Sequence, residues 1–113
     1  MISSWNILDN IEQIDSIQEE SGTKPTVIFK HSTRCGISLH AKHNLESDWN
    51  FDENELIFYY LDLLEHRDIS NEIAKRFNVI HQSPQIIILK QGKSIFDTSH
   101  NAISLEVVQS NLS

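Results

Sequence analysis

Three short apolar segments, separated by stretches with helical periodicity, constrain the fold of this chain more than any other feature. They cover residues 26–30, 56–61 and 85–90 and are rich in isoleucine, leucine, valine and aromatic side chains. A short, nearly continuous apolar run indicates a strand that is buried on both faces of a sheet. Because helical segments lie between these strands, the chain is predicted to be an α/β protein with a mixed central β-sheet flanked by helices.

Weaker patterns complete the predicted order of elements. In chain order they predict a strand at 5–8, helices around 11–17, 37–49 and 69–77, a strand at 93–97 after the Gln91-Gly92 turn, and a closing helix around 103–108. Asp9 and Glu12 have the spacing of a capping box before the first helix. The predicted order is therefore (β)αβαβαββα, in a single domain over residues 1–113.

The composition suits a soluble globular protein, with 39% hydrophobic and 22% charged residues. Nine Lys and Arg residues against sixteen Asp and Glu residues give a net charge of −7, which disfavours nucleic acids and anionic membranes as partners. The single cysteine excludes an intramolecular disulfide, and the first residues lack the pattern of a signal peptide. The expected location is therefore the reducing cytoplasm.

Cys35 lies between the predicted strand at 26–30 and the predicted helix at 37–49. A thiol at the first turn of a helix faces unpaired backbone N–H groups and the positive end of the helix dipole. Both favour the thiolate, which is the reactive form. Ser38 stands three residues on, where a two-cysteine oxidoreductase has its second sulfur. This Cys-x-x-Ser pattern predicts a redox nucleophile that cannot resolve its own mixed disulfide, with a buried, unreactive cysteine as the alternative.

Two neighbours of Cys35 are candidates for supporting roles. Arg34 adds positive charge beside the sulfur, or is a solvated loop cation. Ser38 offers its hydroxyl to the thiolate, or bonds back to the backbone of its own helix.

His40 and His43 share a helix face, but together with Cys35 they do not supply the four ligands of a structural zinc site, so no metal site is predicted.

Four segments of the chain, in the same order, resemble the monothiol bacilliredoxins, the bacillithiol-system YtxJ family of the thioredoxin superfamily. They are residues 29–38 around the cysteine, 62–71, 83–85 and 98–103. The resemblance implies a thioredoxin-like fold and thiol–disulfide exchange through Cys35, removing bacillithiol or another low-molecular-weight thiol from mixed disulfides on cytoplasmic proteins. The S-thiolated proteins and the low-molecular-weight thiol would be the partners. The thiol would act as co-substrate, and no cofactor would be tightly bound.

The resemblance also implies roles for residues near the cysteine. Pro84 begins the strand at 85–90, which suits a residue that cannot donate a ladder hydrogen bond. By the resemblance, the Ser83–Pro84 bond would be cis and face Cys35, so that the backbone of Ser83 pairs with the substrate chain. Gly36 stands where this family often has proline or serine, and we interpret it as a tolerated change at a supporting position.

A second resemblance leaves alternatives open. Residues 35–38, Cys-Gly-Ile-Ser, are similar to the Cys-Gly-Phe-Ser motif of the monothiol glutaredoxins, which hold an iron–sulfur cluster with the help of glutathione. The Gly-Gly-x-Asp turn of those proteins has no counterpart in residues 97–100. The alternatives to an exchange enzyme are an iron–sulfur cluster carrier of this type and a redox-sensing binding module without turnover.

Overall fold

The computed structural model describes residues 1–112 and contains the predicted elements in the predicted order. In chain order they are β1 (Asn6–Ile7), α1 (Gln13–Glu20), β2 (Thr26–His31), α2 (Gly36–Asp48), β3 (Ile57–Asp62), α3 (Arg67–Arg76), β4 (Gln85–Lys90), β5 (Lys93–Ser99), a 3₁₀ turn (His100–Ala102) and α4 (Leu105–Ser110). The predicted α/β class and the mixed sheet flanked by helices are confirmed.

The strands form one mixed sheet with the order β1-β3-β2-β4-β5. β1, β3 and β2 run parallel, while β4 is antiparallel to β2 and β5 is antiparallel to β4. β2 is the central strand, and all of its residues are buried. β2 and β4, two of the three apolar segments of the sequence, therefore lie side by side in the interior of the sheet, as their composition predicts.

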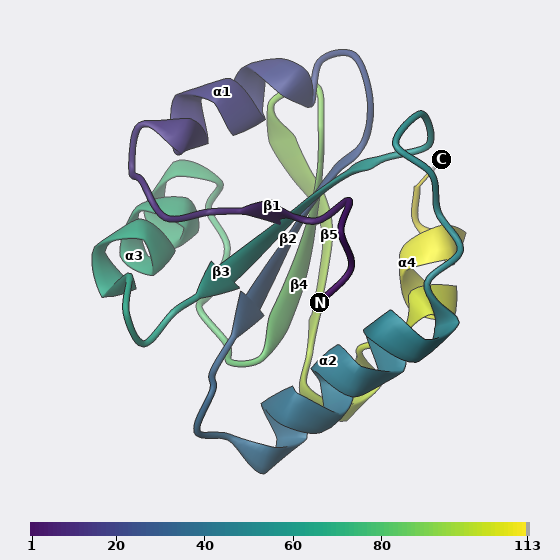
Figure 1. Ribbon diagram of the computed structural model, residues 1–113. Helices are drawn as coiled ribbons and strands as arrows, with labels where there is room; N and C mark the ends of the chain where they lie inside the picture. The colour runs from purple at the N-terminus through teal and green to yellow at the C-terminus, as the bar shows by residue number, and fades with distance from the viewer. Residues whose placement is uncertain (113) are drawn as a thin grey trace.

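Helices cover both faces of this sheet (Figure 1). On one face, α1 and α3 bury residues such as Ile14 and Ile73 against the sheet. On the other face, α2 and α4 bury residues such as Leu45 and Val108 together with an aromatic cluster around Trp5. Because successive side chains of a strand point to opposite faces, β2 contributes Val27 and Phe29 to the second core and Ile28 to the first.

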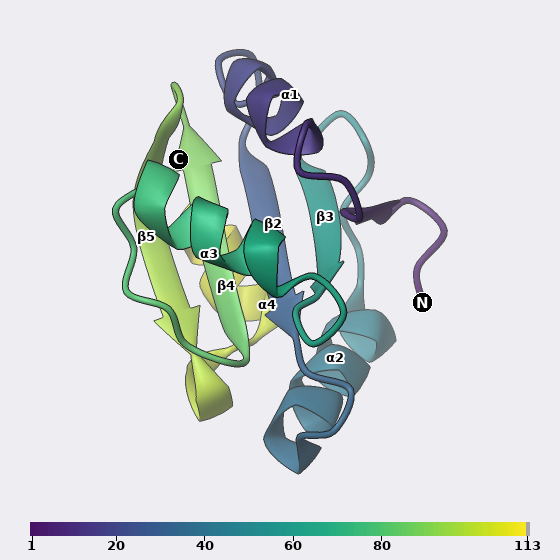
Figure 2. The ribbon, with the colours of Figure 1, turned by 90° about the vertical axis from the view of Figure 1, so that its left-hand side faces the viewer.

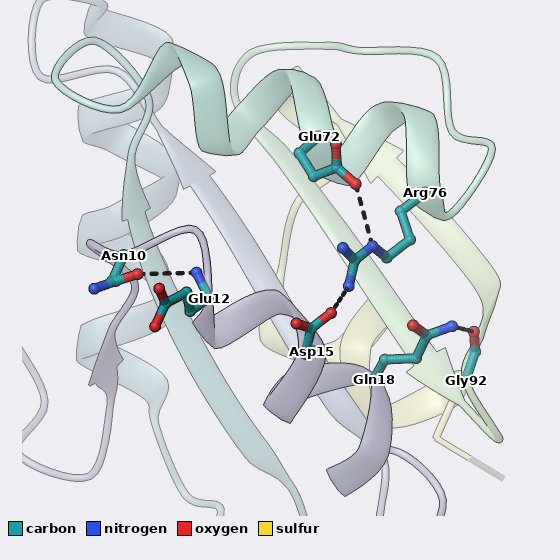
Figure 3. Close-up of polar contacts among 7 residues, drawn as sticks. All are labelled: Asn10, Glu12, Asp15, Gln18, Glu72, Arg76 and Gly92. Atoms are coloured by element: carbon teal, nitrogen blue, oxygen red, sulfur yellow. Dashed lines mark hydrogen bonds and ion pairs between the residues drawn. The ribbon is translucent and has the colours of Figure 1, made fainter.

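Polar contacts join α1 to α3 and to the hairpin between β4 and β5 (Figure 3). Arg76 contacts Glu72 on its own helix and Asp15 on α1. The Gln18 side chain donates a hydrogen bond to the carbonyl of Gly92. These contacts lie at the surface, so we expect each to contribute at most about 1 kcal/mol to stability.

The predicted capping box before α1 is wrong. Glu12 occupies the N-cap position, but its side chain accepts no capping hydrogen bond. The side-chain oxygen of Gln13 accepts the N–H groups of Asp9 and Asn10 instead, at 2.8 and 2.9 Å. The Asn10 side chain accepts the N–H of Glu12 (Figure 3). The helix begins one residue after the predicted box and is stabilised by amide side chains.

One end of the sheet brings distant segments together. β2 ends there and leads into α2, while β4 starts there after the loop that follows α3 (Figure 2). The pairing of Lys30 with Gln85 fixes this arrangement. The parallel pairing of His31 with Asp62 adds the end of β3. Within residues 1–112, no helix has the length and apolar character required to cross a membrane.

Candidate active site at the start of helix α2

Cys35 is the N-cap residue of α2 and is partly exposed. Its backbone is extended, with φ −108° and ψ 122°. Its N–H donates to the carbonyl of Ser32 at 3.2 Å, and its own carbonyl accepts the N–H of Leu39 at 2.9 Å. The side chain makes no capping hydrogen bond. The sulfur is therefore available at the helix end where the dipole favours negative charge.

Ser38 lies on the buried side of the first turn of α2. Its side chain is fully buried, and its Oγ accepts the N–H of Ser32 at 2.9 Å. The same Oγ lies 2.7 Å from Nδ1 of His31. Among the described residues, the hydroxyl has no hydrogen bond to the Cys35 sulfur. The expected contact with the thiolate is thus replaced by contacts that tie the cysteine loop to the end of β2.

His31 completes this small buried network. Its ring is buried between Phe29 and Tyr60, with both ring centroids 5.6 Å away. Burial lowers the pKa of His31, and the nearby Lys42 ammonium lowers it further. The imidazole is therefore neutral at neutral pH, which makes it a positioning group for Ser38 and not a source of charge for the cysteine.

β4 starts at the end of the sheet where β2 leads into α2 (Figure 2). Ser83 and Pro84 directly precede β4, and Cys35 directly precedes α2. The Ser83–Pro84 bond is cis, as predicted. Pro84 is buried, and its carbonyl accepts the N–H of His100 at 3.1 Å. Ser83 is half-buried and lies two residues before Gln85, which pairs with Lys30. Its backbone therefore lies beside the end of β2, from which the cysteine loop departs.

Gly36 and Arg34 flank the cysteine. A Cβ atom added at Gly36 meets nothing within 4 Å, so the fold leaves room for the larger residues expected in the family. Arg34 is exposed and lines a cleft of about 300 Å³ that also includes Arg67 at the start of α3. Among the described residues, neither guanidinium group forms an ion pair.

Lys30 is a buried cation that our sequence analysis missed. Its side chain is fully buried, and Nζ donates to the carbonyl of Ser70 at 3.1 Å and lies 3.2 Å from Nδ1 of His81. Burial lowers the pKa of Lys30 to about 8. Burial also lowers the pKa of His81, and the Lys30 and Arg67 charges lower it further. The sequence feature that could have revealed it is a lysine inside an apolar strand predicted to be buried on both faces.

The Lys30→Met variant should lack a rise of stability with pH that the parent protein shows above neutral pH. Since the folded pKa of about 8 lies below the ordinary value of 10.5, the unfolded chain binds more protons between these pH values. Stability of the parent should thus rise with pH across this window, by about 2 kcal/mol between pH 7.5 and pH 9.5. Lys30→Met should lose that rise, because methionine does not titrate.

Urea unfolding at the two pH values measures this effect. Lys75→Met is the matched control, because Lys75 is exposed on α3 and should leave the rise in place. A parent protein whose stability is flat between pH 7.5 and 9.5, or a Lys30→Met variant that keeps the rise, would contradict the assignment of this titration to Lys30.

Comparison with known proteins agrees with this geometry. The family model described as "Monothiol bacilliredoxin BrxC" matches residues 6–108. This chain belongs to the monothiol bacilliredoxin BrxC family. The match includes every strand of the sheet, the cysteine loop and the Ser83-Pro84 loop. Membership in the BrxC family implies thiol–disulfide exchange of the monothiol bacilliredoxin type, as the sequence motifs indicated.

Solved structures show the same fold. A protein described as having a thioredoxin fold is 29% identical, with a TM-score of 0.82, and the match covers 97% of this chain and 95% of that one. A thioredoxin from Malassezia sympodialis is 20% identical, with a TM-score of 0.75, over 96% of this chain and 88% of that one. A thioredoxin from Fasciola hepatica is 18% identical, with a TM-score of 0.71, over 96% and 99%. The BrxC-family chain thus has the predicted thioredoxin-like fold.

Proposed function

We propose that this protein removes bacillithiol from mixed disulfides on cytoplasmic proteins, with Cys35 as the nucleophile. The observation that carries the proposal is a partly exposed thiol at the N-cap of α2, in a chain of the BrxC family that has no second cysteine. The family supports bacillithiol as the small thiol. Other low-molecular-weight thiols of the same chemistry would react by the same route.

The first step transfers the cap from the substrate protein to Cys35. The Cys35 thiolate attacks the bacillithiol sulfur of the mixed disulfide, so that a new disulfide forms at Cys35 and the old one breaks. The substrate protein leaves as a thiolate and takes a proton from water. Electrons are conserved, because one disulfide is exchanged for another. The positive end of the α2 dipole and Arg34 favour the anionic nucleophile.

The second step needs another molecule of small thiol. Its thiolate attacks the bacillithiol sulfur on Cys35, which releases the oxidised small-thiol disulfide and regenerates the Cys35 thiolate. Position 38 carries a buried serine, so the chain cannot release the small thiol by closing an internal disulfide. The protein therefore depends on an external thiol to complete each turnover.

We expect the loop that contains Ser83 and Pro84 to bind the backbone of the substrate protein. Ser83 lies two residues before Gln85, which pairs with Lys30 near the end of β2, and this position supports a role beside the loop that carries the cysteine. We assign Ser83 and Pro84 to substrate binding, with Arg34, Gly36 and Ser38 as the residues that support the cysteine. Ser38 acts by holding the loop through Ser32 and His31.

A turnover assay tests the proposal. A model protein carrying a bacillithiol cap is mixed with excess bacillithiol and a small fraction of an equivalent of this protein. Many equivalents of cap should be released, faster than with bacillithiol alone. A protein that accelerates nothing would be a redox-sensing module. A brown preparation with visible absorption bands and no acceleration would indicate an iron–sulfur carrier. Either result overturns the proposal.

A further inference from the structure

A charged cleft borders the cysteine loop on the side of β3 and α3. It has a volume of about 300 Å³. Residues from two distant parts of the chain line it: Thr33, Arg34, Asp62, Leu64, Glu65 and Arg67. The parallel pairing of His31 with Asp62 brings these parts together, because the loops after β2 and β3 leave the same end of the sheet. Thr33 and Arg34 directly precede Cys35 in the chain, so the cleft borders the loop that carries the cysteine.

The charged side chains of this cleft form no ion pairs among the described residues. Arg34 and Arg67 are exposed, and the described residues offer neither of them an ion-pair partner within 4.0 Å. Glu65 is likewise exposed and outside these ion pairs. Asp62 is half-buried, and its carboxylate accepts the N–H of Leu64 at 3.2 Å. Two guanidinium groups and two carboxylates of this cleft thus have no ion-pair partner among the described residues, which suits a ligand that carries both signs of charge.

We infer that this cleft binds the small thiol while it attacks the mixed disulfide on Cys35. The inference rests on the proposed function. It assigns the ligand as a thiol with carboxylate and amine groups, a class to which bacillithiol belongs through its malyl carboxylates and cysteinyl amine. Guanidinium groups bind carboxylates through paired hydrogen bonds, so Arg67 and Arg34 recognise the carboxylates. Asp62 and Glu65 face the amine.

A second cleft near the cysteine fits this ligand less well. It has a volume of about 140 Å³ and lies between α2 and the 3₁₀ turn. Its lining includes His40, Asn44 and His100 but no lysine, arginine, aspartate or glutamate. It therefore lacks the permanent charges that a carboxylate-bearing thiol would need. The charged cleft is also the one whose wall is formed by the two residues that precede Cys35.

The test compares two thiols in the reaction that releases the cap from Cys35. The capped protein is prepared first, and its reaction with bacillithiol and with 2-mercaptoethanol is followed by stopped flow. The readout is the ratio of the two second-order rate constants, because any general change in Cys35 reactivity cancels in it. Arg67→Gln should lower the ratio at least about tenfold, the loss expected for a charge-assisted hydrogen bond. Arg67→Lys should recover part of it.

Lys75→Gln is the matched control, since it removes the same charge from an exposed position of the same helix outside the cleft. It should leave the ratio unchanged. An Arg67→Gln ratio equal to that of the parent overturns the inference, as does an equal fall in both variants. A slower uptake of cap from the substrate protein with no change in the ratio would assign the cleft to the protein substrate and also overturns it. Failure of the proposed function would give a different result from failure of this inference, because the parent protein itself would then show no exchange.

Discussion

The Cys35→Ser variant will release cap from a bacillithiol-capped protein no faster than bacillithiol alone. A hydroxyl is not ionised at neutral pH and forms no disulfide, so neither step of the exchange can occur. The chain contains no other thiol that could substitute for it. The measurement is the steady-state rate of cap release, followed by the mass of the substrate protein, with excess bacillithiol and equal amounts of parent or variant.

A double variant separates the position of the thiol from its mere presence. Cys35→Ser combined with Ser47→Cys keeps one cysteine on α2 but moves it to an exposed site near the other end of the helix. At that end of α2 the helix dipole disfavours a thiolate. The new cysteine is also at the opposite end of α2 from Cys35 and the Ser83-Pro84 loop. We expect this variant to be inactive as well. Activity comparable to the parent would show that the site at the helix start is not required.

The second large effect is on stability. Ser38→Ala should lower the free energy of unfolding by about 2–4 kcal/mol, because it leaves two buried polar partners without a hydrogen bond. These are the N–H of Ser32 and Nδ1 of His31. The Cys35→Ser change, at a partly exposed residue without a capping bond, should cost much less. The catalytic and the structural residue of the Cys-x-x-Ser motif would thereby be distinguished.

Urea unfolding of the parent, Ser38→Ala and Ser47→Ala measures this difference. Ser47 is an exposed serine on the same helix, so its substitution controls for the change in helix propensity. Ser47→Ala should change stability by less than about 0.5 kcal/mol. If Ser38→Ala is as stable as Ser47→Ala, the buried network does not hold the cysteine loop in the way described.

The order of elements could be predicted from the sequence because the patterns that specify it are local. β4 begins and ends at the predicted residues, since an uninterrupted apolar run lies between a proline and a glycine turn. The position of Cys35 at a helix start was predicted in the same way, because it lies between the apolar strand at 26–30 and the helical segment at 37–49. The cis bond before Pro84 was predicted only through the resemblance, because nothing in the local sequence requires it.

Contacts between distant residues could not be predicted in the same way. The sequence contained only a weak indication that Ser38 is buried: Ser38, Ala41 and Leu45 have the spacing of one helix face. In the structure all three are buried. Its partner His31 belongs to a strand, and the pairing depends on how α2 packs on the sheet. The charged cleft depends likewise on the pairing of β2 with β3, which joins residues about thirty positions apart.

The most direct test of the account is a single-turnover experiment. The reduced protein is mixed with one equivalent of bacillithiol-capped substrate in the absence of free small thiol, quenched with acid, and analysed by intact mass and peptide mapping. We predict that Cys35 gains the mass of one bacillithiol as the substrate protein loses it, with no other residue modified. An unmodified Cys35 beside a substrate that remains capped, or a cap that appears on the Cys35→Ser variant, would contradict the central claim.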